Sequence, residues 1–438
     1  MKHLLPAALF SLVLAFPAAA QPAGTLREAR TLFAEGDYRA VVERLEAARA
    51  EAALSPEGLR LLGLGYQALM QHGRAVETLS RADTTDRRVR AALARSLEKL
   101  GRKREALDAY RAAYRMDSTD QSLAAALARL YAEAGRWPRV RALYERLVDQ
   151  DPENGFLHAR LAAAYRALDS TDLAIIHYER ARRLIPKSVT VYLNLSSVYV
   201  NSERLISAWR VVDAGVAELP EEPELWRRRG EVALKREEYP EAQTSFEKAL
   251  ALGDSSALTL RNLGATHYLR NHLPEADSVL TWAFATDSTD AMTAFYLGMV
   301  KQYEQEYDAA LDYLHRAAEL MGQSALADVH AQIAATYDQM DRDAEAIRAY
   351  RLTQSLAPDR PEVLFHLAAL YDAYYADLST ALEQYEAFLA RVEEGKLPEM
   401  EAYARQRVRE IRERLFFEAG RQPAPAPSLT DTSGAHRD

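Results

Sequence analysis

The sequence of 438 residues contains no cysteine. Disulfide bonds, thiolate metal sites and thiol nucleophiles are therefore excluded, as is attachment of a lipid through an N-terminal cysteine. A chain without these covalent staples must take its stability from a large apolar core. A hydrophobic content of 48% together with 27% charged residues is sufficient for both burial and solubility.

The sequence also lacks an excess of positive charge. Its 55 Lys and Arg residues are outnumbered by 64 Asp and Glu residues, so the formal net charge is −9. We therefore expect binding neither to nucleic acid nor to an anionic membrane surface. After the first twenty residues no stretch is long and apolar enough to cross a membrane.

The first twenty residues have the pattern of a secretion signal. Lys2 precedes an apolar stretch at residues 4–16, which is too short to span a bilayer, and three alanines follow at residues 18–20. We expect cleavage between Ala20 and Gln21 and export to the periplasm of a Gram-negative bacterium, with association with the outer membrane as a further option. A retained N-terminal anchor is the alternative, and the small residues at the end of the segment argue against it.

Motifs that carry chemistry are missing. There is no G-x-G-x-x-G, G-x-x-x-x-G-K or G-x-S-x-G, and the nearest approach, Gly63-Leu64-Gly65, lies inside a helical pattern with no strand before it. The ten histidines are scattered, and none belongs to an H-E-x-x-H arrangement. We expect no metal, no cofactor and no enzymatic activity. An enzyme with a site at the irregular step between Met321 and Asp328 is the alternative.

What the sequence does contain is a repeat with a period of 34 residues. The residues at one phase of this repeat are Gly101, Gly135, Asp169, Glu203, Glu237, Asn271 and Gln305. An apolar segment precedes each of them, and an alanine usually follows five positions later. A fixed period of this length is typical of a solenoid built from two-helix units.

The unit from Glu222 to Asp254 shows both helices. Leu225, Arg229 and Ala233 share one face of the first helix, and Phe246, Ala249 and Leu250 share one face of the second. Two amphipathic helices of this size cannot bury both apolar faces alone, so successive pairs must stack.

The residues of this unit resemble the tetratricopeptide repeat. The matching positions are Trp226, Gly230, Tyr239, Ala242, Phe246 and Ala249. Neighbouring units match at similar positions, including Leu263, Gly264, Ala276 and Ala283, and Leu297, Gly298, Tyr307, Ala310 and Ala317. The resemblance covers about eleven units and implies an all-α fold, a right-handed superhelical solenoid of antiparallel helix pairs. We expect a signal peptide at 1–20, the solenoid at 21–394, a C-terminal capping helix at 395–418 and a disordered tail at 419–438.

The pattern also predicts how the helices pack. A small residue in the first helix should let the second helix approach, at Ala128, Ala162, Gly230, Gly264 and Gly298. Bulky residues at 110, 144, 178, 246, 350 and 385 should fill the space toward the next unit. Asp117 to Asp120 and Asp287 to Asp290 should supply N-caps. We expect a looser loop at Met321 to Gln323 and an extra residue near Tyr375 to Leu378, with Gly73 out of phase.

The last predicted helix runs from Pro398 to Phe417. Its inner side is expected to carry Tyr403, Val408, Ile411 and Leu415, with arginines and glutamates on the outside. Such a helix is typical of the polar-faced cap that a solenoid needs for solubility.

The resemblance implies that the first helices line a concave groove. In the better-matching units the groove positions include Asn194, Asn201, Arg227, Lys235, Arg261, Tyr268, Phe295, Met299 and Tyr303, together with Ser197, Glu231 and Ala265. Amides and arginines followed by aromatics would suit an extended peptide. The lysine and asparagine carboxylate clamp of chaperone-binding members is not reproduced. Ordinary solvent-facing residues are the alternative interpretation.

We therefore expect a non-enzymatic scaffold or adaptor that binds a protein or peptide in the groove, in an oligomeric state that the sequence does not define. The alternative is a structural subunit of an envelope complex, docked through its convex face or its C-terminal helix. A basic stretch is open to two interpretations, a solvated face or a patch for an acidic partner. It contains Arg87, Arg88, Arg90, Arg95, Lys99, Arg102, Lys103 and Arg104.

Overall fold

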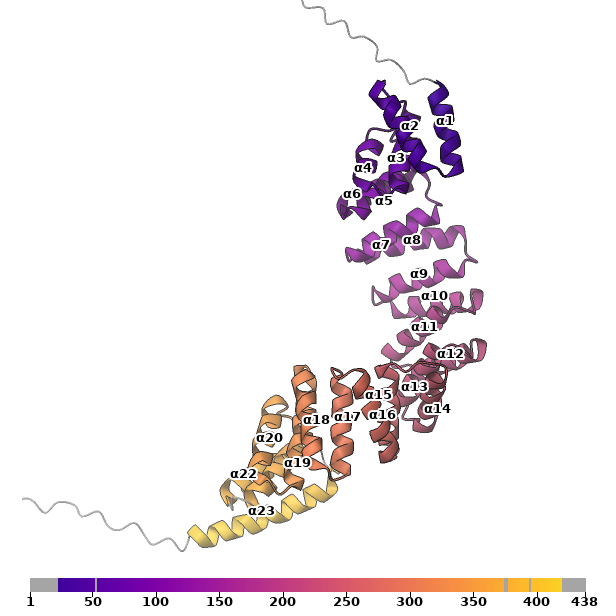
Figure 1. Cartoon of the computed structure of the whole chain (residues 1–438). Coiled ribbons are helices and arrows are strands. Elements are labelled where there is room, and N and C mark those ends of the chain that lie inside the picture. The colour runs from indigo at the N-terminus through magenta and orange to yellow at the C-terminus, as the bar shows by residue number, and fades with distance from the viewer. Residues whose placement is uncertain (1–22, 52, 374–376, 394, 420–438) are drawn as a thin grey trace, which may run out of the picture. The chain divides into compact units, whose positions relative to one another are not determined.

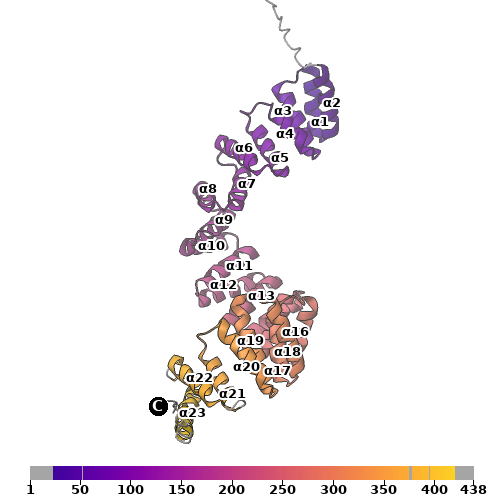
Figure 2. The ribbon, with the colours of Figure 1, turned by 90° about the vertical axis from the view of Figure 1, so that its left-hand side faces the viewer.

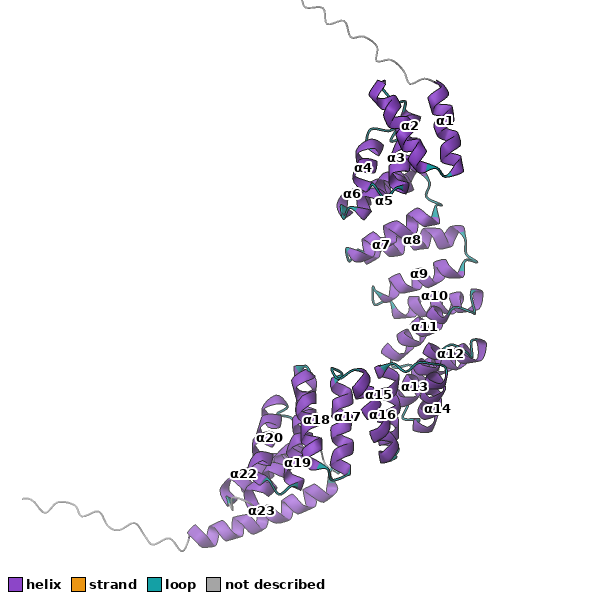
Figure 3. Cartoon of the chain, viewed as in Figure 1, coloured by secondary structure: helices purple, strands orange, loops and turns teal. Residues whose placement is uncertain are grey.

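The computed structural model describes residues 23–419, except for residues 52, 374–376 and 394. Within these residues there are 23 α-helices and no strand (Figures 1 and 3). The predicted signal segment with its cleavage site at Ala20 and Gln21, and the predicted tail from residue 420 onward, lie outside the described residues. The all-α repeat fold expected from the sequence is confirmed. No described helix is both long enough and apolar enough for a membrane span.

The chain divides into two units, and each is described by itself. Unit 1 ends at Arg204 and consists of five helix pairs and a single helix. Its helices are α1 (Ala23–Glu35), α2 (Tyr38–Glu51), α3 (Pro56–Ala68), α4 (His72–Leu79), α5 (Arg87–Lys99), α6 (Lys103–Met116), α7 (Gln121–Glu133), α8 (Trp137–Gln150), α9 (Gly155–Arg166), α10 (Thr171–Leu184) and α11 (Val189–Asn201).

Unit 2 begins at Leu205 with a single helix and continues with five pairs and a final single helix. Its helices are α12 (Leu205–Glu218), α13 (Pro223–Lys235), α14 (Tyr239–Ala251), α15 (Ala257–Leu269), α16 (Leu273–Thr286), α17 (Ala291–Tyr303), α18 (Tyr307–Leu320), α19 (Gln323–Gln339), α20 (Asp343–Leu356), α21 (Pro361–Ala373), α22 (Leu378–Arg391) and α23 (Pro398–Ala419).

The 34-residue phase marks the point where each first helix stops. All seven residues at this phase have a left-handed backbone, with φ from 55° to 73°. The next N–H then donates to a carbonyl five residues earlier, as Arg136 does to Tyr131 at 2.8 Å and Glu238 to Ala233 at 3.0 Å. This Schellman geometry satisfies carbonyls at the helix end and turns the chain into the second helix.

Three further residues continue this series beyond the seven. Gly36 (φ 81°) follows α1, Met70 (φ 60°) follows α3 and Asp341 (φ 55°) follows α19. Gly73, which is out of phase in the sequence, lies instead in the first turn of α4. The repeat is therefore defined by a backbone conformation rather than by the presence of glycine.

A small residue seven positions before this stop lets the two helices of a pair approach. A Cβ placed on Gly230 would lie 2.6 Å from the ring of Phe246, and one on Gly264 would lie 2.5 Å from Leu280. In each case the facing residue is 16 positions later, and this spacing also joins Gly63 to Leu79 and Gly298 to Leu314. Full burial of a side chain such as Phe246 contributes about 2–3 kcal/mol. The predicted roles of Gly230, Gly264 and Gly298 are therefore confirmed.

The irregular step after Gly298 was predicted wrongly as a loop. Residues 321–323 do not form a looser segment, because α18 ends at Leu320 and α19 begins at Gln323. The extra residues are absorbed by α19, which has 17 residues where the other first helices have 12 or 13. Hydrogen bonds within a helix satisfy every added N–H, so lengthening the helix costs less than adding an unpaired loop.

One predicted N-cap behaves differently from the other. Asp120 accepts backbone N–H groups of Ser122 and Leu123 at the start of α7. Asp290 precedes α17 in the same way but accepts hydrogen bonds from the hydroxyl of Thr293 at 2.6 Å and from the guanidinium of Arg261.

The region of the predicted extra residue, Tyr375 and Ala376, lies outside the described residues.

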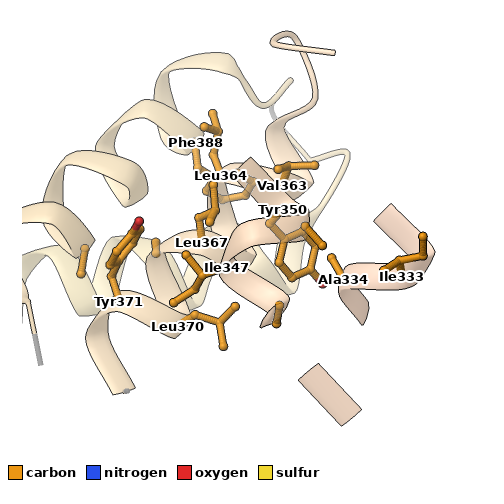
Figure 4. Close-up of a cluster of buried hydrophobic side chains, with 14 of the residues drawn as sticks. Ile333, Ala334, Ile347, Tyr350, Val363, Leu364, Leu367, Leu370, Tyr371 and Phe388 are labelled. Atoms are coloured by element: carbon orange, nitrogen blue, oxygen red, sulfur yellow. The ribbon is translucent and has the colours of Figure 1, made fainter. Parts of the chain in front are cut away.

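The core at the C-terminal end of unit 2 joins the last pairs to α23. Figure 4 shows part of it, with Tyr350, Leu364 and Leu367 packed together. α23 lies beside α22 (Figures 1 and 2) and buries Ala404, Val408 and Ile411. Tyr403, expected on the inner side, is 52% exposed, and its ring contacts those of Phe365 and Tyr385 in the core.

Candidate functional site

The surface formed by the first helices of successive pairs is called here the first-helix face. In unit 2 its aromatic part comes from α15 and α17, where Tyr268, Tyr296 and Tyr303 form a tyrosine patch. The ring centroid of Tyr268 lies 5.8 Å from that of Tyr303 and 6.1 Å from that of Tyr296. Tyr303 is 61% exposed, whereas the other two tyrosines are half-buried. The patch therefore presents the ring of Tyr303 to solvent against the ring of Tyr268, which in turn contacts Tyr296.

The supporting ring of Tyr268 is in a desolvated position. Burial raises the pKa of the Tyr268 hydroxyl to about 12, and the neighbouring phenols of Tyr303 and Tyr296 add to the rise. The hydroxyl therefore stays neutral at physiological pH, and this group can donate or accept a hydrogen bond without a charge. An aromatic cluster of this kind suits apolar contact combined with neutral hydrogen bonding.

Phe295 and Met299, the other two predicted residues of α17, are each partly buried and partly exposed. Phe295 is half-buried, packs against the core toward α19 and contacts the ring of Tyr296 at 5.9 Å. Met299 is half-buried one turn further along the same helix. Ala265 on α15 is 4% exposed and contributes little to any surface. Its predicted groove position is wrong, because adjacent first helices cover that side of α15.

The predicted arginines of the first-helix face are already paired within the protein. Arg227 Nη1 lies 2.5 Å from Glu231 Oε1, and its Nε lies 3.5 Å from Asp254. Arg261 Nη1 lies 3.1 Å from Asp290. A bound peptide would therefore compete with neighbouring carboxylates for Arg227 and Arg261.

The pairing has a repeating origin. An aspartate in the loop before the next first helix reaches back to the arginine, and the same relation joins Arg87 to Asp120 at 2.6 Å in unit 1. Although burial acts in the opposite direction, hydrogen bonds from Ser256 and Thr259 and the charge of Arg227 lower the pKa of Asp254. These arginines tie one pair to the next.

The remaining predicted positions are more accessible. Lys235 is exposed at the end of α13 and forms no ion pair among the described residues. Asn194 and Asn201 belong to α11 in unit 1, where Asn194 accepts a hydrogen bond from Arg166 at 3.1 Å and Asn201 is exposed.

The basic stretch around α5 is partly neutralised. Arg87 pairs with Asp117 and Asp120, Arg102 with Glu105 at 2.6 Å, and Lys103 with Glu133 at 2.7 Å. For these three side chains the structure favours a solvated, ion-paired face over a patch for an acidic partner.

The histidines make one close pair. His158 Nδ1 lies 2.9 Å from His177 Nδ1, and His158 Nε2 lies 3.0 Å from the carbonyl oxygen of Pro152. The sequence places these two residues 19 positions apart and offered no sign of the contact. Within the described part of the chain, no group of three or more His, Asp or Glu side chains has an arrangement suited to a metal ion.

Sequence reasoning missed a hollow between α7, α8 and α9 in unit 1. Its volume is about 620 Å³. The signal was present in two runs of alanine, residues 124–126 and 162–164, which leave little side-chain volume on the first helices. Tyr296 was also missed, because it lies one position beyond Phe295 in the predicted groove register.

Comparison with known proteins supports the repeat. Residues 97–165 match one family model of the tetratricopeptide repeat, and residues 198–281 match another. No curated protein shows a significant match.

Among solved structures the chain is similar to the APC/C hetero-tetramer Cut9–Hcn1, with 14% identity over 88% of this chain and 89% of that chain and a TM-score of 0.47. It is similar to yeast Tom70, with 15% identity over 91% and 99% and a TM-score of 0.41. It is also similar to a repeat protein from Parabacteroides merdae, with 14% identity over 58% and 98% and a TM-score of 0.44.

Proposed function

Because this chain is a tetratricopeptide repeat protein, we propose that it is a non-enzymatic scaffold that binds an extended protein or peptide segment on its first-helix face. The observation that carries the proposal is the tyrosine patch, in which Tyr303 is 61% exposed while its ring is held against Tyr268. An exposed aromatic ring that is already positioned loses little conformational entropy when a partner covers it. Rings of this kind are common binding hot spots.

The working surface of unit 2 then combines the tyrosine patch with Lys235, its accessible cation. The paired arginines Arg227 and Arg261 keep the first helices in register. Their charges are neutralised by Glu231 and Asp290, so they offer a partner N–H donors and no free charge. We propose that the bound segment places an apolar side chain against Tyr303 and Met299.

Alanine substitutions of two exposed aromatic side chains of similar size test this surface. A photo-crosslinking amino acid at position 303 identifies the partner, and the affinity of the purified partner is then measured by titration calorimetry. We expect Tyr303→Ala to weaken binding about tenfold or more, because a hot-spot aromatic is lost. Trp282→Ala is the matched control, since Trp282 is 47% exposed on the second helix α16. Equal affinities of wild type and Tyr303→Ala would remove the tyrosine patch from the function.

A structural subunit docked through α23 is the second candidate. It is favoured by Phe416 and Phe417, which are 75% and 56% exposed near the end of that helix. In this case Phe416→Ala would weaken the complex and Tyr303→Ala would not.

We also propose that the protein acts outside the cytoplasm, on the basis of the signal pattern in residues 1–20. Mass spectrometry of the N-terminus in a periplasmic fraction tests this. A mature chain starting at Gln21 is expected, and an intact Met1 in the cytoplasmic fraction would contradict the proposal.

A further inference from the structure

The hollow in unit 1 has walls of small residues and a floor of larger apolar ones. Its volume is about 620 Å³. Val140 and Tyr144 of α8 form the floor with Ala128, and Trp137 stands at one side. The walls are alanines of the two first helices, at positions 125, 126, 132, 163 and 164. Hollows of about 300–1,000 Å³ accommodate small ligands, so this one is larger than a single side chain needs.

The rim of the hollow carries charge, and most of it is compensated. Arg129 pairs with Glu98 and with Glu133 at 3.4 Å, and Glu133 also pairs with Lys103 at 2.7 Å. Arg160 of α9 is different, because it is exposed and forms no ion pair among the described residues. It lies close enough to the floor to oppose the rise in the pKa of Tyr144 that burial causes. One positive charge therefore stands over an apolar floor without a carboxylate partner.

An exposed aromatic ring lies on the same side of α9. Phe156 is 68% exposed and comes one helical turn before Arg160, and Ala163 of the hollow follows three residues after Arg160. The spacing of four and three residues places Phe156, Arg160 and Ala163 on one helix face. An apolar ring, a free cation and an apolar hollow thus follow one another along α9.

We propose that this surface is a second recognition site, which takes a bulky apolar side chain of an extended partner segment flanked by carboxylates. The apolar side chain fills the hollow above Val140 and Tyr144, and a flanking carboxylate pairs with Arg160. The size of the hollow leaves room for the main chain on either side of the anchor. The inference rests on the proposed scaffold function, but it concerns unit 1 and is independent of the tyrosine patch.

Charge complementarity selects this occupant. The formal net charge of the whole chain is −9, so the uncompensated arginine is the local feature that attracts an acidic segment. A basic segment would place its charges next to the unpaired Arg160, so like charges would oppose its binding. An uncharged apolar segment would fill the hollow but leave Arg160 unused.

Three fluorescein-labelled peptides with the same glycine and serine flanks test the proposal by anisotropy with the full-length protein. The first has leucine between two glutamates, the second has alanine between the glutamates, and the third has leucine between two lysines. We expect the first to bind and the other two to bind at least tenfold more weakly. Equal binding of the alanine peptide, or no binding of the first at 1 mM, would overturn the proposal.

Two variants locate the binding site on the protein. Ala125→Phe fills the hollow from an exposed position, and Arg160→Glu reverses the free charge. Each is expected to weaken the first peptide at least tenfold, and Arg160→Glu is expected also to reduce the dependence of affinity on salt. The control for net charge is Arg104→Glu, at an exposed position in the first turn of α6. Unchanged binding in both test variants would overturn the assignment.

Hydrogen exchange separates this site from the tyrosine patch. Peptide binding is expected to slow exchange in α7 and α9 and to leave α15 and α17 unchanged. Tyr303→Ala should bind the first peptide as wild type does. If the peptide protects α15 and α17 instead, the site in unit 1 is wrong, while loss of partner binding in Tyr303→Ala bears only on the proposed function.

Discussion

Gly230 faces the ring of Phe246 so closely that a Cβ on the glycine would lie 2.6 Å from Phe246 Cε1. Phe246 is fully buried, so its ring has no free space to move into. The contact sets the separation of α13 and α14, and the same 16-residue relation recurs at Gly264 with Leu280 and at Gly298 with Leu314. The spacing of each helix pair is thus decided by one small residue and one large one.

Overpacking at Gly230 should therefore destabilise the protein. We expect Gly230→Leu to lower the free energy of unfolding by about 1–3 kcal/mol, measured by urea denaturation. Gly73→Ala is the matched control, because Gly73 lies in α4 with nothing within 4 Å of a built Cβ. That control should gain up to about 1 kcal/mol from helix propensity. A Gly230→Leu protein as stable as wild type would show that the assigned contact is wrong.

The left-handed stops make a second prediction. Glu237 adopts φ 61° without being glycine, and a left-handed backbone costs a residue with a Cβ about 1–2 kcal/mol. Glu237→Gly removes this cost, but glycine also gives the unfolded chain more conformational entropy. We expect a net rise in the free energy of unfolding of about 0.5–1 kcal/mol. Gly135→Ala, at φ 66°, should lower it by about 1 kcal/mol. Changes of the same sign in both variants would contradict this account.

The histidine pair predicts a loss of stability in acid. Burial and the neighbouring His158 lower the pKa of His177 from its usual 6.5. The unfolded chain therefore binds more protons than the folded one as the pH falls below about 6.5, so the free energy of unfolding decreases there. Burial lowers the pKa of His267, His330 and His366 too, and this adds to the same slope.

His177→Gln isolates the contribution of the pair. Urea denaturation at pH 7.5 and pH 5.5 should show a smaller loss of stability on acidification in this variant than in wild type. The free energy of unfolding of each protein at pH 7.5 is its reference, so a change in stability that is unrelated to protonation cancels in the comparison. An identical loss in the two proteins would mean that the pair does not titrate as described.

The ion pair between α21 and α23 predicts how the last helix is held. Arg407 Nη2 lies 2.9 Å from Asp372 Oδ1, and the Asp372 side chain is 8% exposed. Arg407→Ala leaves this carboxylate buried without its partner, and we expect a loss of about 3 kcal/mol with faster trypsin cleavage in α23. Adding Asp372→Asn should recover part of the loss. Arg414→Ala, which breaks an exposed pair with Glu418, should change stability by less than about 0.5 kcal/mol.

The repeat could be predicted because its causes are local. The stop, the small residue and the large residue all lie within one unit of 34 residues, so the phase from Gly101 to Gln305 can be read directly. The same locality explains the wrong loop at residues 321–323, since a first helix can absorb extra residues without any change in composition. Tyr403 lies at the edge of the buried stripe of α23, in contact with core rings but half exposed, and helical periodicity alone does not define that edge.

By itself the amino-acid sequence determined the all-α repeat, the helix pairs and their close-packed faces, since each depends on residues at most half a repeat apart. Only the tertiary structure decided which polar groups are available to a partner. Arg261 is paired because Asp290, 29 positions later, reaches back from the next loop, whereas Arg160 has no such neighbour. The hollow beside Arg160 is likewise a tertiary property, because an empty volume exists only once three helices enclose it.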